Sequence, residues 1–600
     1  GLPLVRNECS ANDQEPWIDC FEALNTRRRA TTLGNSIRLQ ENWTMLPTIN
    51  TPDRQAEAFP VLTPVQIDHL RPYGNIRSVR AAEILFEPGK SGMSCFVVLS
   101  GKLDIVVSGL SGEQVFVTYG PGQFSGEVVL ISGARALSRG RVSEPGEFLE
   151  IGTDSLRALI AKDAELSDIF MRAFLLRRVA MISGGLGNVV VLGSQHSANT
   201  LRLREFLTRN GHPHSYVDLD SDAASQELLD RFDVKLEDIP VVICSGKTVL
   251  RNPTNQRLAE CLGFAGHIDE HRVYDVVIVG AGPAGLAAAV YAASEGLDAV
   301  VIESEFPGGQ AGASSKIENY VGFPMGISGQ ELAGRAVVQA EKFGAQMMVG
   351  QKVAKIRCDQ RPYQLTLENG GLIETRSIVI ASGAQYNKPN VENLERFEGQ
   401  GIYYAATAME AQLCTGEEII VVGGGNSAGQ AAVFLAETVR KVYMLVRGKE
   451  LSETMSRYLI QRIVENPVIE LHLQTEIVAL AGDSRLNRVT WLNRAKGEES
   501  VHEIGHVFVM AGASPRTDWL RGCLALDKQG FILTGRDLDP VLDSAPLKWP
   551  LSRPPQMLET SLPAVFAVGD IPSGNVKRVA SAVGEGSISI HLVHRALAEM

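Results

Sequence analysis

The stretch Val276-Val277-Ile278-Val279-Gly280-Ala281-Gly282-Pro283-Ala284-Gly285 joins an apolar, β-branched run to the pattern G-x-G-x-x-G. Small residues follow at 286–293, and a second apolar run, 299–302, leads directly into Glu303. This order predicts a strand, a glycine turn, a helix and a second strand ending in an acid, with glycines where the backbone must approach a diphosphate. The free N–H groups at the helix start would bind that diphosphate. Glu303, 23 residues after Gly280, is placed to accept a hydrogen bond from a ribose hydroxyl.

A second glycine pattern, Ile419-Ile420-Val421-Val422-Gly423-Gly424-Gly425-Asn426-Ser427-Ala428, begins 143 residues after the first and again lies between an expected strand and helix. Its next apolar run, 442–446, ends in Arg447, where the first unit has its acid. An arginine there accommodates a 2′-phosphate, whereas an acid prefers a free ribose hydroxyl. The first unit is therefore interpreted as an FAD site and the second as an NADPH site. The NADPH-site predictions are Gly423, Gly425, Asn426, Ser427, Arg447 and Arg457, of which Arg457 is equally compatible with a surface helix position.

Composition restricts the other possibilities. A chain of 600 residues is long enough for about three to five domains, and its net charge of −12 argues against nucleic acid and anionic membrane as main partners. No apolar run approaches the about 18 residues of a membrane span, and no secretory signal is visible. The eight cysteines are scattered without a C-x-x-C, which predicts neither a metal site nor a local redox pair. A reducing, cytoplasmic setting is expected.

The first 60 residues are polar and mixed, and they are expected to be an extension draped on other domains or partly disordered. Residues 61–183 contain short apolar runs separated by glycine-rich turns, followed by a helical pattern. This segment resembles the cyclic-nucleotide-binding domain, a β-roll with a terminal helix. The residues that carry the resemblance are Phe86-Glu87-Pro88-Gly89, Val98-Leu99-Ser100-Gly101 and Phe124-Ser125-Gly126-Glu127-Val128-Val129-Leu130.

The resemblance implies that a Gly-Glu pair opens a short helix, that the Glu binds a ribose hydroxyl, and that an Arg with small neighbours holds the cyclic phosphate. The candidates are Gly126, Glu127, Arg135 and Ser138. The loop is one residue shorter than usual before its Arg and lacks the usual proline, so a degenerate module kept for packing or dimerisation is the alternative.

After a glycine linker at 184–187, residues 188–268 alternate buried strands with helical patterns and resemble the glutaredoxin or thioredoxin fold. Pro240, which begins a strand, matches that family's cis-proline position. Its C-x-x-C would fall at Ser197-Ala198-Asn199-Thr200, where there is no thiol, so dithiol exchange is excluded there. Ser197 and Thr200 are expected to cap the following helix, and Cys244 is expected to be a buried strand residue.

With both glycine patterns placed, residues 273–600 resemble the low-molecular-weight thioredoxin reductase family. The matching segments are Gly308-Gly309-Gln310, 318–324, Ala381-Ser382-Gly383, 565–570, 577–582 and Gly584-Glu585-Gly586. The resemblance implies that Asp570 binds the ribityl chain and that Arg578, Val579 and the helix behind them face the isoalloxazine. The predicted FAD contacts are Gly280, Gly282, Pro283, Ala284, Gly285, Glu303, Gly309, Gln310, Asn319, Val353, Ala381, Gly383, Gly569, Asp570, Arg578, Val579 and Ala580.

The chain departs from that family at its dithiol. The family carries Cys-Ala-Thr-Cys before an Asp, whereas this chain has Ala405-Ala406-Thr407-Ala408-Met409-Glu410. Methyl groups at Ala405 and Ala408 cannot exchange with a disulfide. Cys414, six residues beyond Ala408, has the wrong spacing to replace the pair and is expected to be a buried helix residue.

The fold class expected is therefore multidomain: a β-roll (61–183), an α/β thioredoxin-like module (188–268), and two Rossmann-like α/β domains for FAD (272–385 and 510–600) and NADPH (386–509). The expected function is hydride transfer from NADPH to FAD, then electron transfer to a non-dithiol acceptor: a small organic oxidant, dioxygen or a ferredoxin-like carrier. The alternative is a cyclic-nucleotide or redox sensor or scaffold with residual catalysis. Family resemblance suggests a homodimer.

Overall fold

The structure is a computed structural model that describes residues 52–599, except 89–92, 110–111, 127–135, 137, 184–188, 195–196, 220–237, 245–247, 267, 270, 484 and 540–548. By internal contacts the chain forms two compact units. The first unit comprises residues 1–194 and 211–253, and the second comprises 195–210 and 254–600. The predicted extension at 1–60 lies almost wholly outside the described residues, and its last part forms the helix α2 (Pro52–Ala58).

The first unit contains two antiparallel sheets, with strand orders β2-β6-β4-β5 and β1-β7-β3. Phe96, Val98, Leu103 and Phe148 are buried in one apolar cluster, as expected of inward-facing strand positions. The elements are α3 (Pro64–Leu70), β1 (Asn75–Val79), β2 (Ile84–Phe86), β3 (Cys95–Val98), β4 (Lys102–Gly109), β5 (Gly112–Tyr119), β6 (Arg139–Glu144), β7 (Gly146–Ile151), α5 (Thr153–Lys162) and α6 (Ala164–Ser183).

The same unit holds a mixed sheet of order β11-β10-β8-β9, formed by β8 (Val189–Gly193), β9 (Ser215–Asp218), β10 (Val241–Cys244) and β11 (Thr248–Arg251). β8 is parallel to β9 and antiparallel to β10. The peptide bond before Pro240 is cis, and Cys244 is buried at the end of β10, both as expected. This sheet is compatible with the thioredoxin-like module, whose assignment stays a prediction.

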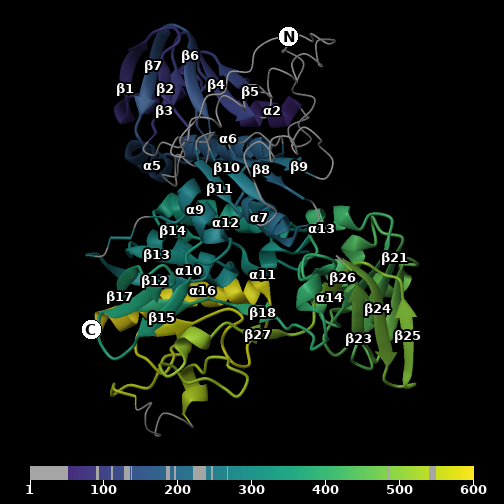
Figure 1. The fold of residues 1–600 in the computed structure, drawn as a ribbon. Coiled ribbons are helices and arrows are strands. Elements are labelled where there is room, and N and C mark those ends of the chain that lie inside the picture. Colours follow the sequence, from purple (N-terminus) through teal and green to yellow (C-terminus); the bar gives the residue numbers. More distant parts are fainter. Residues whose placement is uncertain are drawn as a thin grey trace, which may run out of the picture. The chain divides into compact units, whose positions relative to one another are not determined.

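The second unit is built around two sheets with parallel strands at their centres. In the larger one the order is β14-β13-β12-β17-β16-β15, with β28 also pairing β17. Helices α10 and α16 pack together on an apolar cluster that includes Ile278, Val301 and Val593 (Figure 1). The strands of this larger sheet and the helices of this part of the second unit are α7 (Ala198–Arg209), α9 (Asn255–Leu262), β12 (Val273–Val279), α10 (Pro283–Ser294), β13 (Ala299–Glu303), α11 (Gly309–Gly312), α12 (Gly329–Phe343), β14 (Gln346–Val349), β15 (Val353–Arg357), β16 (Tyr363–Leu367), β17 (Leu372–Ile380), β28 (Val565–Ala567) and α16 (Val579–Ala598).

The other sheet has the order β19-β26-β20-β21-β22, and a two-stranded sheet of β18 and β27 stands where the chain passes between the two sheets. A three-stranded sheet, β23-β24-β25, completes this part. The elements are β18 (Ala384–Tyr386), β19 (Ile402–Tyr403), α13 (Ala408–Leu413), β20 (Glu418–Val422), α14 (Asn426–Leu435), β21 (Lys441–Val446), α15 (Arg457–Glu465), β22 (Ile469–Leu473), β23 (Thr475–Gly482), β24 (Leu486–Asn493), β25 (Glu498–His502), β26 (Val507–Val509) and β27 (Ala513–Pro515). The short 3₁₀ helices are Arg71–Tyr73, Glu395–Phe397, Asp518–Leu520 and Gly535–Leu538.

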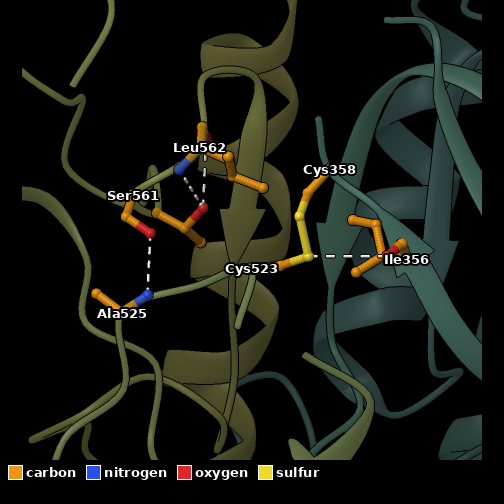
Figure 2. Close-up of a disulfide and its surroundings, with 7 residues drawn as sticks. Ile356, Cys358, Cys523, Ala525, Ser561 and Leu562 are labelled. Atoms are coloured by element: carbon orange, nitrogen blue, oxygen red, sulfur yellow. Dashed lines mark hydrogen bonds between the residues drawn. A yellow bond between two sulfur atoms is a disulfide. The ribbon is translucent and has the colours of Figure 1, made fainter. Parts of the chain in front are cut away.

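Cys358 and Cys523 form a disulfide, which the sequence analysis did not anticipate (Figure 2). They lie 165 residues apart, so no local spacing announces the pair. Cys358 directly follows β15, and Cys523 follows the turn at 518–520, whose Leu520 is buried in the same cluster as Ile356. The bond therefore fastens this turn to β15. It also removes the support that scattered cysteines lent to a reducing compartment.

Among the residues that the structure describes, no helix combines the length and apolar character needed to cross a bilayer.

Candidate functional site

The first glycine turn lies between β12 and α10. Gly280 has φ of 103°, and a Cβ at Gly285 would stand 1.9 Å from the Gly280 carbonyl oxygen, so neither position accepts a larger residue. Gly282 is the N-cap of α10, its helix start has no side-chain cap, and a Cβ built on it would enter open space. The first N–H groups of the helix therefore face room for a ligand, and the turn, with Pro283 and Ala284 in the first helical positions, fits a diphosphate.

Glu303 ends β13 beside this turn because β13 is parallel to β12. The residue is 8% exposed, and its carboxylate accepts from the Ala281 N–H at 2.7 Å and the Glu305 N–H at 2.9 Å. Burial raises the pKa of Glu303, while those two N–H groups lower it. The acid is thus held at the glycine turn, as predicted from its spacing, with an environment that favours a further hydrogen-bond donor such as a hydroxyl.

Asp570 follows β28, which pairs in parallel with β17. Burial raises the pKa of the Asp570 carboxyl, and Lys577 opposes that shift. The residue before it, Gly569, donates its N–H to the Glu585 carboxylate at 2.8 Å, and Asn575 donates to the same oxygen at 2.8 Å. Glu585 and Asn575, which were not among the predicted contacts, therefore fix the backbone next to Asp570. Glu585 lies in a segment that resembles the family, but no spacing in the sequence indicated that it would bond Gly569.

The other predicted FAD positions differ in their surroundings. Gly309 lies against Gly282, since a Cβ on Gly309 would stand 3.2 Å from the Gly282 Cα. The Ala381 carbonyl approaches Gly280, and Gly383 opens to free space. Val353 is a buried core residue at the start of β15. Gln310, in the short helix α11, and Asn319, in a loop, are exposed, and Arg578, Val579 and Ala580 form the start of α16.

The second glycine turn repeats the first between β20 and α14. Gly423 has φ of 142°, and a Cβ there would stand 2.5 Å from the Met510 carbonyl oxygen. Gly425 is the N-cap of α14 without a side-chain cap, again facing open space. Asn426 accepts from the Ser456 N–H at 2.7 Å, which holds the start of α15 against this turn. The turn therefore offers a second uncapped helix start to a diphosphate.

Arg447 and Arg457 are both exposed, at the end of β21 and at the first position of α15. This exposure leaves both guanidinium groups accessible to an anion.

Tyr386 was not predicted, although the structure places its hydroxyl beside the second turn. It ends β18, and its hydroxyl interacts with Ser427, the second residue of α14. Burial raises the pKa of Tyr386, and the charge of Asp570 adds to the increase. Its phenol thus lies within electrostatic reach of residues from both nucleotide sites.

A sequence profile decides the family. The profile described as pyridine nucleotide-disulphide oxidoreductase matches residues 274–586, and that of the cyclic nucleotide-binding domain matches residues 76–163. The chain belongs to the pyridine nucleotide-disulphide oxidoreductase family.

Within this family the chain is similar to thioredoxin reductases. That of Bacillus subtilis (strain 168) is 29% identical over 334 residues, which is 56% of this chain and 98% of the relative. That of Mycolicibacterium smegmatis is 31% identical over 328 residues, 54% of this chain and 97% of the relative. The crystal structure of T. acidophilum thioredoxin reductase is 28% identical and covers 55% of this chain and 100% of its own, with a TM-score of 0.48. The protein is thus a flavoprotein oxidoreductase of thioredoxin reductase type with a cyclic nucleotide-binding domain, and its family implies FAD and NAD(P)H.

In this oxidoreductase, the segment expected to replace the dithiol forms the approach to α13. Ala405 is half-buried, and Ala408 begins the helix. The Glu410 carboxylate accepts from the Thr407 N–H at 2.8 Å and from the Thr407 hydroxyl, which satisfies the helix start. Cys414 is buried as expected but lies one residue beyond the helix, and burial raises the pKa of its thiol to about 12. A thiol this buried and this weakly acidic is a poor nucleophile.

The cyclic nucleotide-binding domain of the oxidoreductase contains a cavity of about 30 Å³, room for about one water molecule. Gly126 and Ser138 line it, together with the buried Arg177 of α6. The Arg177 guanidinium donates to the carbonyls of Ala58, Phe124 and Gly126 at 2.8 to 3.0 Å. The predicted ligands Glu127 and Arg135 lie outside the described residues. In this arrangement the cavity does not accommodate a nucleotide.

Proposed function

We propose that the protein binds FAD at the first glycine turn and NADPH at the second, and that it reduces an acceptor other than a dithiol of its own. The observation that carries the proposal is the repetition of one geometry. Each turn places an uncapped helix start, at Gly282 and at Gly425, in front of open space and behind a central parallel strand. Two such sites in one compact unit suit two dinucleotides.

The roles of the protein's residues at the flavin site follow from their positions. The start of α10 binds the diphosphate, Glu303 accepts from a ribose hydroxyl, and Asp570 accepts from the ribityl chain. Glu585 keeps Gly569 in place so that the Asp570 carboxyl faces the cofactor. Bound FAD supplies the capacity to take up two electrons as hydride and to pass them on.

At the second site Arg447 provides a planar, permanently charged donor for a 2′-phosphate, and Arg457 adds a second positive charge. Arg447 stands in the second unit where the first unit has Glu303, and this exchange of an acid for an arginine is the reason for preferring NADPH over NADH.

The acceptor is proposed from what the chain lacks in sequence. Alanine stands at positions 405 and 408, and Ser197 and Thr200 stand where a thioredoxin-like module would carry its thiols. The acceptor classes that remain are a small organic oxidant, dioxygen and a ferredoxin-like carrier. The thioredoxin-like module is proposed to be inactive in thiol exchange, and the whole enzyme to be a homodimer.

A second function, cyclic-nucleotide sensing, is favoured by the domain match at 76–163, and it requires the small cavity at Gly126 and Ser138 to enlarge before a nucleotide can enter. A bound cyclic nucleotide would have to displace the carbonyl contacts that Arg177 makes there, so binding would change how α6 is held.

One preparation tests both. Purified protein should be yellow and release about one FAD per chain on denaturation. Under nitrogen, NADPH should bleach the flavin, and a screen of quinones, oxygen and ferredoxin should then identify what restores the colour. Addition of cyclic AMP or cyclic GMP to the same assay tests regulation. A colourless protein that takes up no added FAD would refute the proposed function.

A further inference from the structure

Helix α7 belongs to the predicted thioredoxin-like module in sequence, yet it is part of the second compact unit together with the nucleotide sites. It begins at Ala198, and the hydroxyl of the preceding Ser197 accepts from the Thr200 N–H at 3.4 Å, so Ser197 caps the helix as expected. Thr200 supplies that N–H, and its own buried hydroxyl has no hydrogen-bond partner among the described residues, so the expectation that Thr200 also caps the helix is wrong. The helix ends at Arg209, and that end lies against the flavin-site turn at 308–312.

Arg209 makes three contacts from one guanidinium group. It donates to the Glu205 carboxylate at 3.2 Å and to the Gly309 carbonyl oxygen at 2.8 Å. Its guanidinium carbon lies 3.4 Å from the centre of the Phe306 ring, which is a stacked cation–π contact. The side chain is only 10% exposed. A planar fork can make all three contacts at once, whereas a lysine could make only some of them.

The turn that Arg209 contacts is conformationally demanding. Gly308 and Gly309 have φ of 102° and 52°, the left-handed region that an L side chain rarely adopts. Gly308 donates its N–H to the Ala281 carbonyl at 2.7 Å, so the turn is joined to the glycine turn of the diphosphate site. Two glycines lose much backbone freedom when they are ordered, and an outside hydrogen bond to Gly309 opposes that loss.

Two further hydrogen bonds join the end of α7 to the same region. The Asn210 side-chain amide donates to the Glu305 carbonyl at 3.2 Å, and the Gln330 amide donates to the Thr208 carbonyl at 3.0 Å. The end of α7 is therefore hydrogen-bonded both to the segment that follows Glu303 and to helix α12.

We propose that Arg209 is a positioning residue for the flavin site: from α7 it holds the turn at Gly308–Gly312 in the shape that receives FAD. This inference rests on the proposed FAD site. It gives the thioredoxin-like segment a role without thiols, because the helix that would follow a C-x-x-C now supports the flavin turn.

The test compares Arg209→Ala and Arg209→Lys with Glu205→Gln in the full-length protein. Glu205→Gln removes the ion pair on the same helix but leaves the fork free to bind Gly309, so it is the matched control. Two quantities are measured: FAD affinity of the flavin-stripped protein, and hydrogen exchange of the amides at 308–313 without FAD. Loss of a charge-assisted hydrogen bond predicts FAD binding weaker by roughly tenfold in Arg209→Ala, with faster exchange at Gly308 and Gly312.

Arg209→Lys should fall between wild type and Arg209→Ala, because an ammonium can still reach one acceptor. Glu205→Gln should leave both quantities close to wild type. Unchanged exchange and affinity in Arg209→Ala would overturn the proposal, as would equal losses in Glu205→Gln and Arg209→Ala. If the unmodified protein refuses FAD while exchange responds to Arg209, the proposed FAD site fails and the support of the turn stands.

Discussion

Removing the Cys358–Cys523 disulfide should destabilise the second unit by several kcal/mol. The bond closes a loop of 165 residues, and the chain-entropy relation for a loop of this length gives about 5 kcal/mol at 25 °C. Removal of a native disulfide typically lowers the free energy of unfolding by about 2–5 kcal/mol, so the loss expected for the double variant Cys358→Ser/Cys523→Ser lies in that range.

The structure also indicates how the loss of stability should be detected. The turn at 518–520 keeps its apolar anchors, since Leu520 and Leu524 are buried in the same cluster as Ile356. Ser561 accepts from the Ala525 N–H at 2.9 Å next to the bond (Figure 2). The folded arrangement should therefore survive without the disulfide, and the change should appear in the free energy of unfolding rather than in the fold.

The assay is unfolding in guanidinium chloride, followed by far-UV circular dichroism, with and without a phosphine reductant. The unfolding midpoint of wild type should fall on reduction. The midpoint of the double-serine variant should equal that of reduced wild type and should not change when the reductant is added. Cys261→Ser, which alters a cysteine of the same unit that lies outside the disulfide, is the control and should respond to reductant as wild type does. Identical midpoints for wild type and the double-serine variant would refute the reasoning.

Three further results are expected. Arg447→Ala should raise the KM for NADPH roughly ten- to a hundredfold and that for NADH far less, since only NADPH offers a 2′-phosphate; equal effects would show that Arg447 does not contact it. The unmodified protein should not reduce thioredoxin in rapid mixing with NADPH under nitrogen, whereas a variant with cysteines at Ala405 and Ala408 should gain that activity; equal rates would mean that another thiol exchanges. Glu559→Ala should lower the free energy of unfolding by about 3–5 kcal/mol, because Glu559 is fully buried and paired with Arg553. Glu599→Ala, which removes an exposed partner of the same Arg553, should lower it by less than about 1 kcal/mol. Similar losses in the two variants would contradict the assignment of a buried charge pair.

Much of the site was predictable because its elements are local. A glycine turn, the helix behind it and the next strand occupy about 25 consecutive residues, and β-branched runs and small residues specify them by short-range packing. Hence the turns at Gly280 and Gly423, the buried acid at Glu303 and the cap at Ser197 appear where the sequence placed them. The strands of the cyclic nucleotide-binding domain could also be predicted, because apolar runs and glycine turns alternate along the chain.

Which distant residues meet depends on how the whole chain packs. Glu585 supports Gly569 because α16 packs onto α10, Arg209 reaches Gly309 because α7 joins the second unit, and Cys358 bonds Cys523 because their segments share a core. None of these pairings leaves a trace in spacing or periodicity, since sheet order and helix packing bring the partners together. The two glycine turns follow from the sequence alone, and the alanines at 405 and 408 are the basis for the proposal that the family's thiols are replaced. The long-range contacts that hold the flavin site depend on burial of apolar surface that is assembled only when the whole chain folds.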